Sequence, residues 1–136
     1  MVILVDTNIL MDILTNREPY AEYGKDILEK CAKREIIEIM AAHSIPNLFH
    51  ILRKDFSQKE RRDLLKKLCS IFRISDLNTK KILAALENDK FLDFEDCLQE
   101  VCAAEEIADY IVTRNPKDFA ESREQVIQLD AFLNLF

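Results

Sequence analysis

Acidic and amide side chains occur where an apolar run of the sequence ends or where a helix is expected to begin. Asp6 directly follows the run VILV, and Asn47 lies shortly after the run IIEIMAA. Asp93 and Asp96 are three residues apart, a spacing that places both on neighbouring parts of one helical face. Hard cations such as Mg²⁺ and Mn²⁺ prefer oxygen ligands of this kind and keep several waters. These residue types therefore favour a divalent metal that activates water.

A further polar group follows the last long apolar run, DYIVT. Thr113 and Asn115 close this run, and Asp118 follows shortly after them. Several of the candidates also have a purely structural explanation. Asn115 precedes a proline and can make a turn, and Asp93 can cap a helix. An acid after four buried residues, as at Asp6, is costly without a partner, which favours a functional role.

The elements that must position these residues alternate along the chain. The apolar runs predict strands at 2–5, 36–42, 72–77, 109–113 and 126–129. Helices are expected from about Asn8, from Pro19 to residue 33, after a cap at Ser44, after a capping box at Ser57 and Glu60, over 80–88, and from Asp93 to about residue 107.

This alternation predicts an α/β fold in which helices cover both faces of a parallel sheet. In such folds ligands bind beyond the carboxyl ends of the strands, where the returning helices begin. The candidate residues all end a strand or begin a helix. Asp109 instead begins a strand and is excluded, while Asp12 is expected at the surface or supporting the site from further along its helix.

The bulk properties fit a single domain over residues 1–136 with a net charge of −6. The apolar start lacks a basic leader segment, and no apolar stretch is long enough to cross a membrane. The four cysteines form no C-x-x-C pair, which favours a reduced cytoplasmic protein without structural zinc. A local group of lysines and arginines between residues 53 and 67 is interpreted either as a solvated helix face or as an RNA surface.

Four segments of the sequence resemble, in order, the signature regions of PIN domains, with the nearest likeness to the VapC-like toxin branch. These segments are VDTNILMDIL (5–14), AAHSIPNLFHILRK (41–54), DFEDCLQEVCA (93–103) and DYIVTRNPKDF (109–119). The resemblance spans essentially the whole chain. It implies a three-layer α/β/α sandwich and Mg²⁺- or Mn²⁺-dependent endoribonuclease activity on single-stranded RNA. It also implies a homodimer and, often, a small antitoxin encoded alongside.

The resemblance assigns site residues position by position. Asp6 and Asp96 match two acids of the family, and Thr113 matches the hydroxyl residue near the metal. Asn115 stands where many members carry an acid and a good number carry asparagine, with Asp118 as a possible substitute. The sequence departs from the family at Asn47, where a glutamate is usual, because an amide brings an oxygen but no negative charge.

The resulting hypothesis is hydrolysis of RNA phosphodiesters by a metal-activated water. Asp6 and Asp96 would bind the metal with Asp93 as an auxiliary ligand. The residues expected to orient water or phosphate are Asn47, Thr113 and Asn115, and those expected to grip the RNA backbone are Arg114 and Lys117.

The sequence is also compatible with two alternatives. The first is a domain whose catalysis has weakened and which binds only RNA or protein. The second is a receiver-like phosphotransfer domain, which ranks behind because the first strand is followed by only one acid and because Arg114 follows Thr113 where such domains have a lysine.

Overall fold

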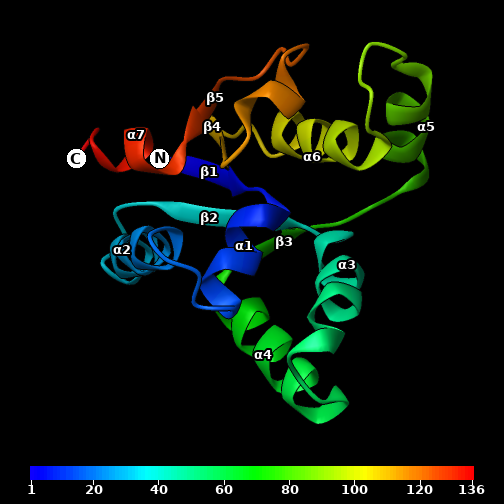
Figure 1. Ribbon diagram of the computed structural model, residues 1–136. Coiled ribbons are helices and arrows are strands. Elements are labelled where there is room, and N and C mark those ends of the chain that lie inside the picture. Colours follow the sequence, from blue (N-terminus) through cyan, green and yellow to red (C-terminus); the bar gives the residue numbers. More distant parts are fainter.

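The fold is built on five parallel strands. The computed structural model describes residues 1–136, and its sheet has the strand order β3-β2-β1-β4-β5 with every neighbouring pair parallel (Figure 1). The strands are β1 (Val2–Val5), β2 (Ile37–Ala41), β3 (Arg73–Ser75), β4 (Tyr110–Thr113) and β5 (Val126–Gln128). The predicted α/β class and the parallel sheet are therefore confirmed.

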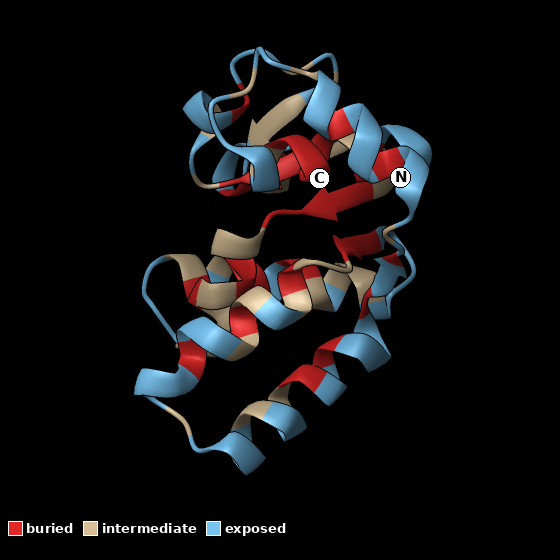
Figure 2. Cartoon of the chain, turned by 90° about the vertical axis from the view of Figure 1, so that its right-hand side faces the viewer, coloured by how far each residue is buried: buried red, intermediate tan, exposed pale blue.

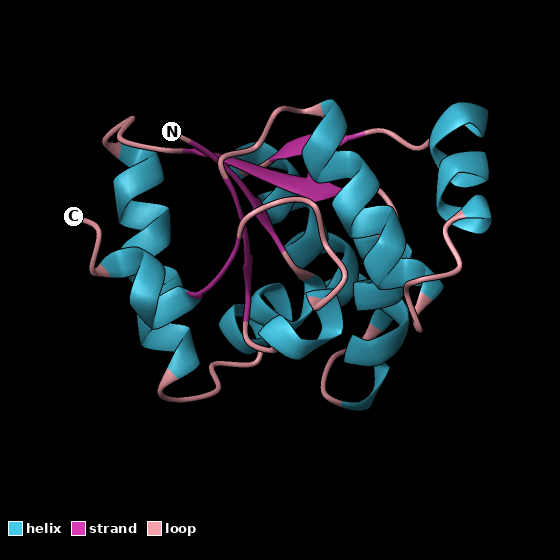
Figure 3. Ribbon diagram, turned by 90° about the horizontal axis from the view of Figure 1, so that it is seen from above, coloured by secondary structure: helices cyan, strands magenta, loops and turns pink.

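Helices form a layer on each face of this sheet, as the view from above also shows (Figure 3). One layer contains α1 (Thr7–Leu14), α2 (Tyr20–Ala32), α3 (Ser44–Ile51), the short helix η1 (Leu52–Lys54), α4 (Gln58–Ile71) and α7 (Leu129–Leu133). The other contains α6 (Phe94–Glu105) and η2 (Pro116–Phe119), with α5 (Thr79–Glu87) packed on α6. None of the helices combines the length and apolar character that a membrane crossing requires.

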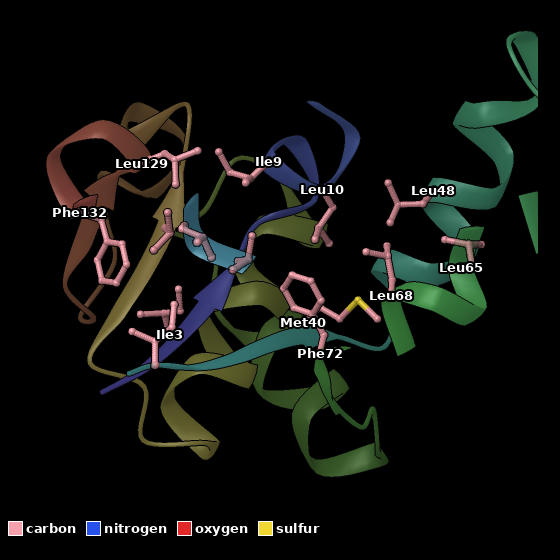
Figure 4. Close-up of a cluster of buried hydrophobic side chains, with 14 of the residues drawn as sticks. Ile3, Ile9, Leu10, Met40, Leu48, Leu65, Leu68, Phe72, Leu129 and Phe132 are labelled. Atoms are coloured by element: carbon pink, nitrogen blue, oxygen red, sulfur yellow. The ribbon is translucent and has the colours of Figure 1, made fainter. Parts of the chain in front are cut away.

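The apolar strands are explained by burial on both faces of the sheet. Ile3 and Val5 belong to the cluster under α1, α2 and α7, whereas Leu4 points to the α6 side. All three side chains are buried, because successive side chains of a strand point to opposite faces and both faces are covered. The buried strands form the centre of the molecule in Figure 2, and Figure 4 shows the larger cluster, including Phe132 of α7.

The starts of the helices show which of the predicted caps are formed. The predicted capping box is present: Ser57 Oγ accepts from the Glu60 backbone N–H at 3.2 Å, and the Glu60 carboxylate accepts from the Ser57 N–H at 3.0 Å. The predicted cap at Ser44 was wrong, because Ser44 is the first helical residue and its hydroxyl lies 2.9 Å from that of Thr7. The last strand is also shorter than predicted, since Leu129 begins α7.

The only glycine of the chain lies where α2 crosses α1. A Cβ added to Gly24 would overlap the Ile13 side chain and lie 2.7 Å from its Cδ1. We expect Gly24→Ala to destabilise the fold by about 1–3 kcal/mol, because the two helices must separate or Ile13 must leave its rotamer. Urea unfolding measures this loss. Ala32→Gly at the exposed end of the same helix is a control for helix propensity, and an unchanged midpoint for Gly24→Ala would contradict the close packing of the two helices.

Candidate metal centre

A cavity of about 480 Å³ opens beyond the carboxyl ends of the central strands β1 and β4. Only 2 of its 16 lining residues are hydrophobic. Its acidic residues are Asp6, Asp12, Asp93, Glu95, Asp96 and Asp118, and its amide residues are Asn8, Asn47, Gln99 and Asn115. Side chains that are far apart in the sequence therefore meet at the edge of the sheet where ligands of parallel α/β folds bind.

Asp6 is held rigidly at the end of β1. One carboxyl oxygen accepts from the Thr7 backbone N–H at 2.8 Å, so Asp6 caps α1, and the other accepts from the Thr113 hydroxyl at 2.8 Å. Burial raises the pKa of Asp6, the two hydrogen bonds lower it, and the nearby Asp118 and Asp93 raise it further. An oriented carboxylate in this environment is stabilised by a nearby cation.

Asp93 and Asp96 occupy the start of α6. Asp93 is the N-cap, and its side chain accepts from the Asp96 backbone N–H at 2.9 Å. The structural explanation for Asp93 therefore holds, and its side chain also lines the cavity. Burial, followed by repulsion from Asp6, Asp93, Asp118 and Glu95, raises the pKa of Asp96 to about 7. The free chain thus gathers more negative charge here than it can neutralise.

The remaining predicted residues divide between the cavity and its surroundings. Asn47 and Asn115 line the cavity, and so does Asp118. Thr113 is fully buried and is not among the lining residues; its hydroxyl donates to Asp6 and accepts from the Asn115 backbone N–H at 3.1 Å. The geometry therefore gives Thr113 the task of orienting the Asp6 carboxylate.

The two predicted RNA-gripping cations lie in different environments. Arg114 lines the cavity, but one of its terminal nitrogens contacts both carboxyl oxygens of Asp12, at 2.8 and 2.9 Å. Asp12 is 2% exposed and so is not at the surface; it holds the guanidinium in place. Lys117 lines an adjoining cavity of about 370 Å³ together with Lys90, and the two cavities share Asp93, Asp96 and Asp118.

Glu95 and Gln99 are among the cavity residues that sequence reasoning missed. Gln99 is 2% exposed; its amide nitrogen donates to the hydroxyls of Thr7 at 3.0 Å and Ser44 at 3.2 Å, and its amide oxygen has no partner within the protein. Helical spacing could have found both. Gln99 is three residues after Asp96 and four after Glu95, and residues at these spacings share a helical face.

The donor set fits a hydrated Mg²⁺ or Mn²⁺ rather than a fully caged ion. No three acidic, histidine or cysteine side chains converge closely enough to enclose an ion by themselves. Magnesium needs only one or two direct carboxylates and retains several waters, which the carboxylates and amide oxygens of this cavity can orient. The raised pKa values of Asp6 and Asp96 and the unpartnered oxygen of Gln99 are both observations that a hydrated cation would account for.

The chain is similar to a known family in sequence and to solved structures in fold. A family model described as PIN domain matches residues 2–117. No curated protein matches the sequence. Among solved structures, the VapBC2 complex of Rickettsia felis bound to a promoter DNA fragment gives a TM-score of 0.73 at 17% identity, covering 94% of this chain and 98% of that chain.

Two further solved structures share the fold. The chain in a toxin-antitoxin complex from Klebsiella pneumoniae gives a TM-score of 0.65 at 23% identity, with 93% of this chain and 96% of that chain covered. Mycobacterium tuberculosis VapC20, described as a toxin that cleaves the sarcin-ricin loop, gives 0.62 at 10% identity, with 80% and 86% covered. At these identities the likeness concerns the fold.

Proposed function

The chain belongs to the PIN-domain family, and from this premise we propose that it is a metal-dependent endoribonuclease that hydrolyses phosphodiesters of single-stranded RNA. The observation that carries the proposal is the acidic cavity at the sheet edge, where Asp6 and Asp96 arrive from a strand and from a helix that are far apart in the sequence. Both carboxyl groups have raised pKa values, and a bound cation would stabilise the charged form of both.

The residues of the cavity have separable tasks in this reaction. A bound Mg²⁺ or Mn²⁺ supplies an activated water and neutralises charge on the phosphate. Asp6 and Asp96 would hold this metal directly, with Asp93 as an auxiliary ligand. Thr113 keeps the Asp6 carboxylate in one orientation through its hydrogen bond. Asn47 and Asn115 offer amide groups that position water or a phosphate oxygen.

In this proposal, positively charged side chains that line the two cavities bind the RNA backbone. Arg114 is held by Asp12, so its guanidinium is oriented in advance and has unused N–H groups for a phosphate. Lys117 and Lys90 line the adjoining cavity, which continues from the acidic residues. A single strand that passes over both cavities would meet positive charge on either side of the acidic centre.

A protein partner is the second part of the proposal. Two of the similar structures are described as a VapBC complex bound to promoter DNA and as a toxin-antitoxin complex. We infer that this chain acts as a toxin, pairs with a small antitoxin and forms a homodimer. Light scattering of the purified chain tests the dimer. The partner is tested by looking for a small antitoxin-like reading frame beside the gene and by asking whether its protein product co-purifies with the chain.

The activity itself is tested with purified chain and an end-labelled single-stranded RNA. We expect cleavage with millimolar Mn²⁺ and none with excess EDTA, because the carboxylates alone cannot activate water. A fully paired RNA of the same sequence is the control for strand selectivity. Absence of both Mn²⁺ binding and cleavage at millimolar ion would favour a domain that only binds RNA or protein.

A further inference from the structure

Glu95 is an acid that the structure ties into the mouth of the cavity. It lies in the first turn of α6 next to Asp96, and its side chain is exposed enough to extend into solvent. Its carboxylate instead accepts a hydrogen bond of 3.0 Å from the side-chain nitrogen of Asn47, on α3. The backbone carbonyl of Glu95 also lies 3.1 Å from Nε2 of His43, so the start of α3 holds both parts of this residue.

The nature of the tether keeps the negative charge available. Glu95 forms no ion pair with any lysine, arginine or histidine of the chain. An amide N–H orients a carboxylate without neutralising it, whereas a lysine or arginine would cancel the charge. Holding a further carboxylate beside Asp96 and Asp93 is electrostatically unfavourable in the free chain. With a cation in the cavity, the carboxylate of Glu95 would instead be favourable, because it would be attracted to the cation.

A second observation on the same helix also points to a ligand. Gln99 is one turn after Glu95 on the same face, and its buried amide oxygen lacks a donor. Its nitrogen is held by Thr7 and Ser44, so the amide cannot turn freely to find one. A water molecule in the cavity, oriented by a cation, would supply the missing hydrogen bond. Glu95, Asp96 and Gln99 of α6 thus all line the same cavity with oxygen-bearing side chains.

We propose that Glu95 is a carboxylate of the metal centre and that Asn47 is the residue that positions it. The pair then places on α6 the negative charge that α3, with an amide at position 47, does not carry. This inference rests on the proposed function, because it assigns a role within the same cavity. Glu95 would contact the cation or one of its waters, and the side-chain nitrogen of Asn47 holds Glu95 in place, while the Asn47 amide oxygen can still orient water or phosphate.

The test is titration of the purified chain with Mn²⁺, with the binding measured by calorimetry. Glu95→Gln removes the charge and keeps an oxygen that can accept from Asn47, and we expect Mn²⁺ binding about 10-fold weaker. Asn47→Asp with Glu95→Gln exchanges the amide and the carboxylate, so we expect affinity to return to within about 3-fold of the parent chain. Glu105→Gln, at the exposed other end of α6, is the matched control and should bind as the parent does.

The outcomes separate this inference from the proposed function. If the parent chain binds no Mn²⁺, both fail together. If the parent binds and Glu95→Gln binds equally well, only the assignment of Glu95 is wrong. A purely structural link between α3 and α6 predicts that Glu95→Gln lowers the unfolding temperature without metal and leaves the affinity unchanged, and that result would also overturn it.

Discussion

Replacing either Asp6 or Asp96 with asparagine is expected to abolish Mn²⁺-dependent RNA cleavage, with a rate loss of about 10³-fold. Each substitution removes one negative charge from a centre that has few direct ligands. A metal stabilises the charge of the transition state by several kcal/mol, and each 1.4 kcal/mol corresponds to about tenfold in rate. The amide also binds a divalent ion more weakly than the carboxylate does.

The measurement is single-turnover cleavage of a labelled single-stranded RNA at saturating chain. Asp26→Asn, on the exposed side of α2, is the matched control and should cleave at the parent rate. Thermal unfolding without metal separates catalysis from folding. Asp96→Asn should be at least as stable as the parent, because burial and neighbouring carboxylates already disfavour its charged form. Parent-like cleavage by both variants would show that the metal site lies elsewhere.

Glu38→Gln is expected to stabilise the fold at alkaline pH and to change it little near pH 5. Glu38 lies on β2 with 1% exposure, and neither carboxyl oxygen has a hydrogen-bond partner within the protein. Burial raises its pKa to about 8, and the neighbouring Cys31 opposes this shift in part. Burial therefore favours the neutral carboxylic acid here in the folded chain at pH 7.

The direction of the pH effect follows from proton binding. Between the ordinary pKa of a glutamate and about pH 8, the folded state binds the proton and the unfolded state has released it. The stability of the parent chain therefore falls as pH rises through this interval, and the loss is complete above about pH 8. At about 1.4 kcal/mol for each pKa unit, this one residue accounts for roughly 2–5 kcal/mol.

Urea unfolding of parent and variant at pH 5 and pH 9 measures the difference. The free energies of unfolding should agree within about 1 kcal/mol at pH 5, and the variant should be more stable by several kcal/mol at pH 9. Glu22→Gln, exposed on α2, controls for the loss of one charge. Equal stabilities at both pH values would mean that Glu38 reaches solvent or a partner and titrates normally.

The sequence alone determined the features that depend on neighbours along the chain. Apolar runs marked the five strands, and the capping box at Ser57 marked the start of α4, because side-chain periodicity and helix caps act over a few residues. The rule for the edge of a parallel sheet then placed Asp6, Asp96 and Asn115 together in one cavity. Placing residues at one edge requires only the strand and helix order.

Only the tertiary structure decided what each side chain does at that edge. The Thr113 hydroxyl donates to Asp6, and Arg114 forms an ion pair with Asp12. The side-chain nitrogen of Asn47 donates to Glu95. These partners lie 48 to 107 residues apart in the sequence. Their contacts depend on how the helices pack on the sheet and on which rotamers that packing allows, and no local pattern encodes either. The sequence therefore predicted which residues share this edge of the sheet, and the packing of α3 and α6 across β1 and β4 determined the contacts that they make there.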